Sequence, residues 1–568
     1  MAKELISGAH ILMRSLIHEG VTTLFGYPGG AIMPTYDALF DYTDSLQHIL
    51  VRHEQAAAHA AEGYARVSGK VGVCLVTSGP GATNTITGIA DALMDSTPIV
   101  VIAGQVAAHL LGSDAFQECD VVNVAQPITK WSYQIRSASE VAWAVSRAFY
   151  IARSGRPGPV VLDFTRSAQL ELAEYLPQTI NHIRSYVPVP PMCEEAIASA
   201  ATLINNAQRP LVLVGQGVEL GEAQEELRAF IELADMPAGC TLLGLSALPS
   251  AHPLNMGMLG MHGTLANNIK TQECDLLIAV GMRFDDRITG KLDTYAKQAK
   301  KIHFDIDPVE INKNVKVDVA VLGDCKVTLP AVTRLLKKKD HRVWRASFEP
   351  YHERERIRVV EPELFPTTGP IKMGEAIHRI SEATGHKAVC VTDVGQNQMM
   401  AARYFKFSQK RSLLTSGGMG TMGYGLPAAI GATFGAPERD VILMVGDGGI
   451  QMVIEEFGTI LEYGCPVKMV LLNNEYLGNV RQWQEMFFNH RYSFSPMRNP
   501  NFQLIAAGYG IKSRRVTERE HLDEAIAEMM STDGAYLLEV CVEQEGTVMP
   551  MCCPGSAIND MILEIKHT

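Results

Sequence analysis

The stretch "VILMVGDGGIQM" at residues 441–452 decides the fold of this chain. Five apolar residues run directly into the glycine-flanked Asp447, a pattern typical of a buried parallel strand that ends at a turn into a helix. Gly464 is a plausible end for that helix, and its predicted apolar face consists of Val453, Phe457, Ile460 and Leu461. The stretch therefore predicts a strand–turn–helix unit of an α/β sheet.

A second buried strand, "VKMVLLNNEYLGN" at residues 467–479, ends in two asparagines. Ligands of open α/β sheets bind beyond the carboxyl ends of the strands, so we expect Asp447 and Asn474 at one sheet edge. A carboxylate, an amide oxygen and exposed glycine backbone suit Mg²⁺ holding a diphosphate, and the backbone carbonyl of Tyr476 could add a third oxygen. Taken singly, GDG and Asn-Asn are more often a turn and a strand-end loop. The helix and strand between them make the pair more specific.

The totals describe an ordinary globular protein. The 568 residues, 47% hydrophobic and 20% charged, suggest about three domains. A net charge of −12 argues against nucleic acid or an anionic membrane as partner. Eleven cysteines without a CxxC motif indicate free thiols in a reducing cytoplasm. The first twenty residues predict an amphipathic helix and no signal peptide, and the glycines and Pro427 of the uncharged stretch 412–437 argue against a membrane span.

Two linkers divide the chain: the proline-rich "YVPVPPMCEEA" at 186–196 and the highly charged stretch 335–370. They delimit segments 1–185, 190–335 and 365–568, each expected to bury its own core. All three alternate short apolar strands with helical stretches, which predicts an α/β fold of three doubly wound domains with mainly parallel sheets. Residues 74–104 and 412–448 share a strand, TSG-turn, helix and strand order, a hint that the two outer domains are related.

Two further patterns are weak when taken alone. Glu54 opens an alanine-rich helix, where a carboxylate in the first turn gains about 0.3–1 kcal/mol from the helix dipole whatever its function. In the middle segment "RPLVLVGQGV" (209–218) gives a strand and a GxG turn, and two later strands end in arginines and aspartates. That set suits a nucleotide across the sheet ends, and surface ion pairs explain it about equally well.

The motifs together closely resemble thiamine-diphosphate enzymes, and among them the catalytic subunit of the acetohydroxyacid (acetolactate) synthase family. The resemblance runs nearly end to end, through "FGYPGGAIMP", "RHEQAAAHAAEGYAR", "TSGPGATN", "DAFQE", "GMHGT", "VGMRFDDR", "DVGQNQM", "GTMGYGLPAAIGA", "GDGG…LLNNEYLG" and "VRQWQ". GDG…NN marks the thiamine-diphosphate superfamily, whereas "RFDDR", "DAFQE" and "VRQWQ" narrow it to the biosynthetic, FAD-containing synthases. The resemblance implies pyrimidine-binding, FAD-binding and diphosphate-binding domains of similar topology.

The resemblance also implies the roles of single residues. Mg²⁺ would be held by Asp447, Asn474 and Tyr476, and thiamine diphosphate would contact Glu54, Gln396, Asn397, Met422, Gly446, Gly448 and Gly449. Glu54 would hydrogen-bond the aminopyrimidine ring and so promote loss of the thiazolium proton. FAD, without a net redox role, would contact Arg156, His262, Arg283, Asp285, Asp305 and Asp324.

The implied reaction decarboxylates pyruvate and condenses the two-carbon unit with a second 2-keto acid, pyruvate or 2-ketobutyrate. Arg287 would bind the carboxylate of that acid and Trp483 would favour 2-ketobutyrate. Gly29, Phe116, Gln117 and Lys130 would line the site from the partner chain of a homodimer or tetramer. A small regulatory subunit is a further implied partner.

Two departures and two rivals accompany the resemblance. Asn479 replaces a usual methionine, and Cys552-Cys553 replaces apolar or proline residues of the C-terminal arm, which puts acceptor preference and inhibitor response in doubt. One rival is another enzyme of the same cofactor: a pyruvate oxidase, disfavoured by "RFDDR" and Trp483, or a glyoxylate carboligase, disfavoured by Glu54. The other is a non-catalytic flavin- or nucleotide-binding scaffold, which the intact Glu54, Asp447 and Asn474 argue against.

Overall fold

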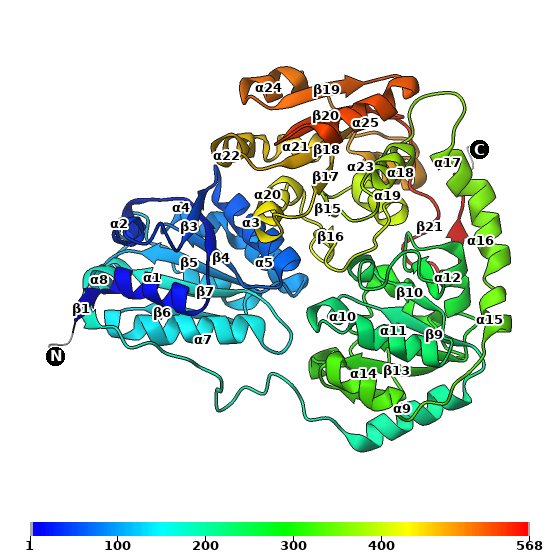
Figure 1. Ribbon diagram of the computed structural model, residues 1–568, viewed down its shortest axis with the longest axis horizontal. Coiled ribbons are helices and arrows are strands. Elements are labelled where there is room, and N and C mark those ends of the chain that lie inside the picture. Colours follow the sequence, from blue (N-terminus) through cyan, green and yellow to red (C-terminus); the bar gives the residue numbers. More distant parts are fainter. Residues whose placement is uncertain (1–3, 566–568) are drawn as a thin grey trace.

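The computed structural model describes residues 4–565 and confirms the α/β fold class. In that range the chain forms three six-stranded parallel sheets, each flanked by helices, and two short antiparallel pairs (Figure 1). The apolar runs supply the central strands, since β17 (Val441–Gly446) and β18 (Val467–Asn473) are buried almost throughout. Strands buried on both faces need helices on both sides, and this is why short apolar runs alternate with helices.

The N-terminal sheet has the order β3-β2-β4-β5-β7-β6. Its strands are β2 (Thr23–Gly26), β3 (Gln47–Leu50), β4 (Gly72–Val76), β5 (Ile99–Gln105), β6 (Trp131–Ile135) and β7 (Val160–Thr165). Its helices are α1 (Gly8–His18), α2 (Met33–Phe40), α3 (Glu54–Ser68), α4 (Pro80–Asn84), α5 (Ile86–Met94), α6 (Val121–Ala125), α7 (Val141–Arg153) and α8 (Arg166–Leu170). The predicted first helix starts later than expected, because β1 (Leu5–Ser7) precedes it and pairs with β8 (Leu172–Glu174).

The C-terminal sheet has the order β16-β15-β17-β18-β20-β19. Its remaining strands are β15 (Val389–Thr392), β16 (Leu413–Leu414), β19 (Lys512–Val516) and β20 (Tyr536–Cys541). Its helices are α18 (Met373–Ala383), α19 (Gln396–Tyr404), α20 (Gly425–Gly435), α21 (Asp447–Gln451), α22 (Phe457–Tyr463), α23 (Gly478–Phe487), α24 (Phe502–Gly508) and α25 (Leu522–Ser531). Numbered within each sheet, the two outer sheets share the order 2-1-3-4-6-5, which supports their expected relation.

The two segments that echo each other in sequence are nevertheless not equivalent in this topology. Residues 74–104 contain the third and fourth strands of their sheet, whereas residues 412–448 contain the second and third. Small-residue helices against a sheet produce similar patterns in several positions. The similarity of the two segments therefore reflects the same kind of unit at different positions, while the shared strand order supports the relation of the two domains.

The middle sheet has a different order, β11-β10-β9-β12-β13-β14, so the expected similarity of all three domains is wrong for this one. Its strands are β9 (Pro210–Val214), β10 (Ala238–Cys240), β11 (Asn255–Met258), β12 (Leu276–Val280), β13 (Lys300–Asp305) and β14 (Val319–Leu322). Its helices are α9 (Glu194–Asn206), α10 (Gly217–Leu220), α11 (Gln224–Leu233), α12 (Leu265–Thr271), α13 (Asp286–Thr289) and α14 (Cys325–Thr333). The order reverses between β9 and β12, a switch point at which such sheets bind ligands.

The charged stretch 335–370 is largely helical, which corrects its interpretation as a linker. It contains α15 (Arg342–Ala346), α16 (Glu349–Glu355), a π-helical turn (Arg356–Val360) and α17 (Glu361–Leu364), which follow one side of the molecule from the middle to the C-terminal domain (Figure 1). Trp344 is buried, and its indole N–H donates to the carbonyl of Pro210 at 2.8 Å. The charges form the outer face of helices whose apolar residues pack on the middle domain.

The cores of the middle and C-terminal domains are continuous, so the expectation of three separate cores is corrected. One buried cluster includes Phe230 and Phe304 of the middle domain and Ile377 and Leu538 of the C-terminal domain. The C-terminal arm adds a further link: Cys552, in β21 (Met551–Cys552), donates its backbone N–H to the carbonyl of Met261 at 2.8 Å, and β21 pairs with β22 (Met561–Ile562). These contacts fix the arm against the middle domain.

Two further details bear on the predictions. The helix expected after Asp447 is interrupted by a 3-10 turn (Ile454–Glu456), and Leu461 of α22 is 60% exposed, so Leu461 does not belong to the predicted apolar face.

Among residues 4–565 no helix combines the length and the apolar character that crossing a membrane requires.

Candidate active site

Asp447 and Asn474 emerge side by side at one edge of the C-terminal sheet. Strands β17 and β18 are parallel neighbours, with Gly446 opposite Leu472, and both polar side chains are almost fully buried. The amide nitrogen of Asn499 donates to Asp447 Oδ2 at 2.6 Å and to Asn473 Oδ1 at 2.9 Å. The two motifs thus lie at one edge of the sheet, as the sequence predicted.

Gln396 and Asn397, at the start of α19, adjoin this cluster. Asn474 Nδ2 donates to Gln396 Oε1 at 3.3 Å, and a Cβ on Gly446 would lie 3.2 Å from Asn397 Nδ2. Asn397 Oδ1 is buried without a hydrogen-bond partner among the described residues, which leaves an acceptor free for a ligand. The predicted diphosphate contacts therefore lie together.

The glycines of the GDG turn pack closely against neighbouring side chains. A Cβ on Gly448 would lie 2.7 Å from Leu477 Cδ2 and 3.6 Å from Met422 Cε, which places the predicted cofactor-propping methionine next to the GDG turn. A Cβ on Gly449 would meet the carboxylate of Asp393 at 2.5 Å. A side chain at either position would overlap its neighbours, so the close packing of this turn requires glycine.

The electrostatics of this edge favour a cation. Burial raises the pKa of Asp447 to about 6, with hydrogen bonds from Asn499 and nearby backbone N–H groups acting in the opposite direction. A positive charge next to the carboxylate would keep it ionised at neutral pH. Tyr476 follows on the same loop, where its backbone N–H donates to Asn474 Oδ1 at 3.3 Å. The donor set is the oxygen-rich kind that Mg²⁺ prefers.

Glu54 lies at the first position of α3, and Asn84 Nδ2 donates to its Oε2 at 2.9 Å. The loop between β4 and α4 surrounds it: a Cβ on Gly81 would be 3.4 Å from Glu54 Oε1, and one on Gly79, which has φ of 56°, would be 2.9 Å from the carbonyl of Gln117. Gly29 approaches the same loop, since its Cβ would lie 2.5 Å from Thr77. The structure thus groups Glu54, Gln117 and Gly29.

The two remaining N-terminal candidates behave differently from each other. Phe116 is 89% exposed on the loop before Gln117, available to a second chain. Lys130 is occupied within its own chain, because its ammonium group donates to the carbonyls of Ile151 and Ser154 and to the hydroxyl of Tyr186. Burial lowers the pKa of Lys130 to about 8. The structure does not bring Lys130 to the group around Glu54.

A cavity of about 1460 Å³ opens at the switch point of the middle sheet. Its lining includes the residues expected to contact FAD or the second substrate, together with the unusual Asn479: Arg156, His262, Arg283, Asp285, Arg287, Asp305, Asp324, Asn479 and Trp483. Residues of α23 close one side and the loop 416–420 another. The volume is larger than that of most small-molecule sites, which suits an extended ligand.

The polar side chains of the cavity are held in defined positions. Asp285 caps α13 and Asp324 caps α14, each accepting a backbone N–H of its helix. Arg156 donates to Glu310 at 2.8 Å and to Ser96 at 2.9 Å. Gly215 and Gly217 interlock with Gly281, since a Cβ on Gly215 would meet the carbonyl of Gly281 at 2.2 Å. The GxG turn thus serves close packing of two strand ends.

Burial keeps a histidine of this cavity neutral. The pKa of His262 is lowered to about 4, mainly by burial and then by Arg403, and its Nδ1 has no hydrogen-bond partner among the described residues. A neutral ring with a free nitrogen can accept or donate one hydrogen bond to a ligand. Arg287, by contrast, is exposed and pairs with the adjacent Asp286 at 3.4 Å.

Sequence reasoning missed several residues that shape the site. Asp393 accepts the backbone N–H groups of Gly423 and Gly425 at 3.0 and 2.9 Å and so fixes the loop that carries Met422. Asp95 does the same for Gly417 and Gly418 at 2.7 Å each. A lone aspartate after a strand or helix gives little signal by itself. The backbone groups bound by Asp393 lie about thirty residues along the chain, and those bound by Asp95 lie about three hundred residues away.

Comparison with known proteins assigns the class. Three parts of the chain match family models for the thiamine pyrophosphate enzyme: the N-terminal TPP binding domain over residues 6–124, the central domain over 197–332 and the C-terminal TPP binding domain over 393–540. The chain belongs to this family of thiamine pyrophosphate enzymes.

Curated relatives point to one group within the family. The chain is 43% identical to the acetolactate synthase isozyme 2 large subunit of Escherichia coli, covering 99% of this chain and 100% of that protein. It is 44% identical to the acetolactate synthase large subunit of Parasynechococcus marenigrum, covering 99% and 91%. It is also 42% identical to chloroplastic acetolactate synthase 2 of Nicotiana tabacum, covering 98% and 85%.

Proposed function

We propose that this chain is the catalytic large subunit of an acetohydroxyacid (acetolactate) synthase. It would decarboxylate pyruvate and join the two-carbon unit to pyruvate or 2-ketobutyrate, giving 2-acetolactate or 2-aceto-2-hydroxybutyrate for branched-chain amino acid synthesis. The observation that carries the proposal is the end-to-end similarity to acetolactate synthase large subunits, 43% over the whole length of the Escherichia coli protein. The clusters around Asp447 and Glu54 and the large cavity support the proposal, because they contain side chains of the kinds that this reaction would use.

The proposed cofactors would occupy the diphosphate cluster around Asp447, the surroundings of Glu54 and the cavity of the middle domain. Asp447, Asn474 and the Tyr476 carbonyl would hold Mg²⁺, and the diphosphate would lie against the glycines of the GDG turn with Gln396 and Asn397 beside it. Asn397 Oδ1, which is buried without a hydrogen-bond partner among the described residues, supports this placement. FAD would occupy the cavity at the middle sheet. The volume of this cavity and the carboxylates of Asp285 and Asp324, which cap helices at its wall, suit a dinucleotide. Thiamine diphosphate, when bound, supplies a nucleophilic carbon and an electron sink for decarboxylation.

Glu54 would move the proton that starts the reaction. Its carboxylate, oriented by Asn84, would hydrogen-bond the ring nitrogen of the aminopyrimidine and so make the adjacent amino group basic. The first turn of α4 lies close to this carboxylate, since a Cβ on Gly81 would be 3.4 Å from Glu54 Oε1. Because a general acid–base group acts only within hydrogen-bond reach, the orientation of Glu54 matters as much as its charge.

Arg287 and Trp483 would select the second substrate. The exposed guanidinium of Arg287 can exchange its weak partner Asp286 for the carboxylate of a 2-keto acid and bind it through two parallel N–H groups. Trp483, on α23, packs edge to face on Phe487 with ring centroids 5.5 Å apart, which gives the cavity an aromatic wall. That wall would favour the additional methylene of 2-ketobutyrate.

The active unit would be a homodimer, alone or within a tetramer, with Gly29, Phe116 and Gln117 facing the diphosphate cluster of the partner chain. Large apolar side chains exposed around these regions support a protein partner there: Met33 is 53%, Phe116 89%, Met419 49% and Met452 54% exposed. Lys130 would contribute there only after releasing its present acceptors. A small regulatory subunit and a cytoplasmic location belong to the same proposal, as do domains at 1–185, 190–335 and 365–568.

The test is a product analysis with purified protein, thiamine diphosphate, Mg²⁺ and FAD. We expect 2-acetolactate from pyruvate without oxygen uptake, and mainly 2-aceto-2-hydroxybutyrate when 2-ketobutyrate is added. Oxygen-dependent formation of an acetyl product would identify a pyruvate oxidase instead. Flavin binding without any thiamine-diphosphate-dependent product, even with a small subunit present, would favour the non-catalytic scaffold.

A further inference from the structure

A buried glutamate of the C-terminal domain reaches the backbone next to Glu54. Glu456 ends the 3-10 turn between α21 and α22 and is fully buried. Its Oε1 accepts the backbone N–H groups of Arg52 at 2.8 Å and His53 at 3.0 Å, and its Oε2 accepts the hydroxyl of Thr459 at 2.6 Å. One carboxylate thus joins the two domains at the residues that immediately precede Glu54.

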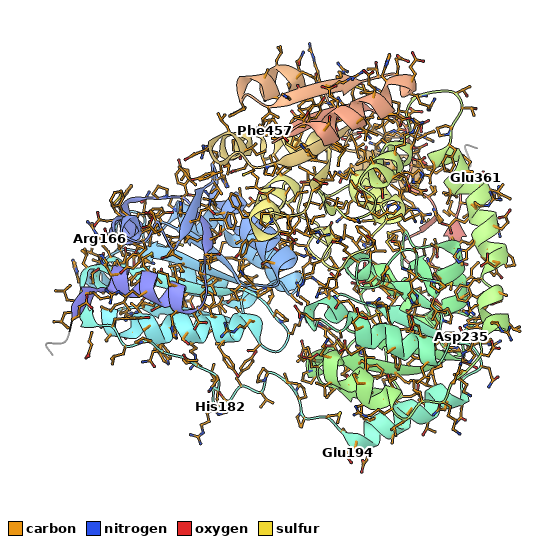
Figure 2. The ribbon with its side chains drawn as sticks, in the orientation of Figure 1. Arg166, His182, Glu194, Asp235, Glu361 and Phe457 are labelled. Atoms are coloured by element: carbon orange, nitrogen blue, oxygen red, sulfur yellow. The ribbon has the colours of Figure 1, made fainter. Side chains whose placement is uncertain are left out.

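Further hydrogen bonds join the segment between β3 and α3 to the C-terminal domain. The guanidinium of Arg52 donates to the carbonyl of Gly458 at 2.9 Å and to Glu462 at 2.7 Å, and the backbone N–H of Leu50 donates to the hydroxyl of Tyr463 at 2.9 Å. Figure 2 labels Phe457, the residue after Glu456, on the edge of the C-terminal domain that faces the N-terminal domain. The end of β3 and the start of α3 are therefore bound to α22 by backbone and side-chain bonds.

These bonds hold the two residues that come directly before Glu54, the first residue of α3. N–H groups at the beginning of a helix have no partner within the helix, and the preceding residues determine the direction in which the first turn points. His53 caps α3 by accepting the N–H of Gln55 at 3.1 Å, and Glu456 in turn fixes the N–H of His53 itself. These two bonds tie the beginning of α3 to Glu456 of the C-terminal domain.

We propose that Glu456 is a positioning residue for Glu54. By accepting the backbone N–H groups of Arg52 and His53, Glu456 fixes the two residues before Glu54 and so directs the Glu54 carboxylate towards the aminopyrimidine ring. This inference rests on the proposed function, because it assigns Glu456 to the proton transfer that Glu54 performs there. Glu456 itself is bonded to protein groups through both oxygens and is not assigned a catalytic role.

Three variants and one control separate positioning from general packing. Glu456→Ala removes both acceptors, Glu456→Asp withdraws the carboxylate by one methylene, and Glu456→Gln keeps an oxygen for the two backbone N–H groups. The control Glu455→Gln changes a half-buried glutamate next to Glu456, whereas the backbone N–H groups of Arg52 and His53 are bound by Glu456. If Glu456→Ala does not fold, Glu456→Asp carries the test.

The first readout is amide hydrogen exchange of residues 50–56 in the cofactor-free protein. We expect exchange to be at least about tenfold faster in Glu456→Asp and Glu456→Ala, because the two N–H groups lose their acceptor. Wild-type rates are expected for Glu456→Gln and Glu455→Gln. Unchanged protection in Glu456→Asp would overturn the assigned contact independently of any activity.

The second readout is the kinetics of 2-acetolactate formation with saturating cofactors. In Glu456→Asp and Glu456→Ala the displaced Glu54 should lower kcat by about 100-fold, while KM for pyruvate stays within about twofold of the wild type. Glu456→Gln should retain most of the wild-type kcat. Faster exchange with unchanged kcat in Glu456→Asp would overturn the positioning role. A wild-type protein that forms no 2-acetolactate would instead refute the proposed function and leave the exchange result standing, so the two failures are distinguishable.

Discussion

At the scale of single residues, Glu54 is the most consequential side chain. It opens α3 with one oxygen bonded to Asn84. We expect Glu54→Gln to lower the rate of 2-acetolactate formation by at least about 100-fold, because the amide cannot exchange a proton with the ring. Binding of thiamine diphosphate, measured by equilibrium titration, should change little. A variant with wild-type rates would show that Glu54 is not the proton-transfer residue.

Trp483 allows a prediction on substrate choice. In the variant Trp483→Leu the cavity wall loses its aromatic ring, and we expect the preference for 2-ketobutyrate over pyruvate to fall by about tenfold, the usual range for one methylene in an apolar pocket. Competition between the two acids, with both products quantified, measures this ratio directly. An unchanged product ratio would remove Trp483 from acceptor selection.

The relative positions of residues can be predicted from sequence where the spacing is local. The neighbouring positions of Asp447 and Asn474 could be predicted because each residue directly follows a strand, and adjacent parallel strands end at one edge of the sheet. Asn499 was missed, because its bonds to Asp447 and Asn473 span 52 and 26 residues and no local pattern announces them. The Lys130 ammonium illustrates the opposite case, in which a motif match says nothing about the acceptors that the fold provides.

At the scale of elements, the packing of α3 on α20 joins the outer domains. A Cβ on Gly63 would lie 2.0 Å from the carbonyl of Ala428, and one on Gly431 would lie 1.9 Å from the carbonyl of Ala60. The two helices touch backbone to backbone at both crossings, so the glycines act as a reciprocal pair. The alanines and glycines of the two helices permit this close approach.

We expect Gly63→Ala to destabilise the protein by about 1–3 kcal/mol, the usual cost of overpacking. The matched control is Gly508→Ala at the end of α24, where a Cβ meets nothing within 4 Å and helix propensity predicts a neutral or slightly favourable effect. Urea unfolding followed by circular dichroism compares the two variants. Equal stability of Gly63→Ala and the wild type would contradict the close approach of the helices.

The elements that sequence could not place share a physical reason. Strands such as β17 were predicted because both of their faces are buried and the residues are uniformly apolar. The stretch 335–370 was misread because its high charge density hides the few apolar residues, among them Trp344 and Phe348, that pack it on the middle domain. The order of the strands in each sheet depends on contacts between distant residues, and a single sequence does not contain that information.

At the scale of the whole molecule, a buried acidic cluster crosses the boundary between the outer domains. His59 Nδ1 lies 2.9 Å from Glu62 Oε1 and 3.9 Å from Asp91 Oδ2, and the hydroxyl of Ser416 donates to Asp91 at 2.6 Å. Burial raises the pKa of Asp91 to about 8, with the nearby Glu62 and Asp95 adding to the rise. The folded protein therefore binds a proton here that the unfolded chain releases at lower pH.

This shift fixes the sign of a pH effect on stability. The contribution of Asp91 is fully present below the pKa of an exposed aspartate, near 4, and is lost as pH rises towards about 8. Each pH unit in that window costs about 1.4 kcal/mol for one released proton. Thermal unfolding of the wild type and Asp91→Asn between pH 5 and 8 measures it. A slope unchanged in Asp91→Asn would refute this role.

The assembly of the active site allows the most direct measurement. Glu54→Gln and Asp447→Ala chains should each be inactive alone, because one lacks the proton-transfer carboxylate and the other the metal ligand. If Glu54 of one chain works with Asp447 of its partner, co-expressed mixed dimers contain one intact site, and random pairing should restore about a quarter of the wild-type rate of 2-acetolactate formation. Mixed dimers, verified by two affinity tags, that remain as inactive as their parents would contradict a site shared between two chains.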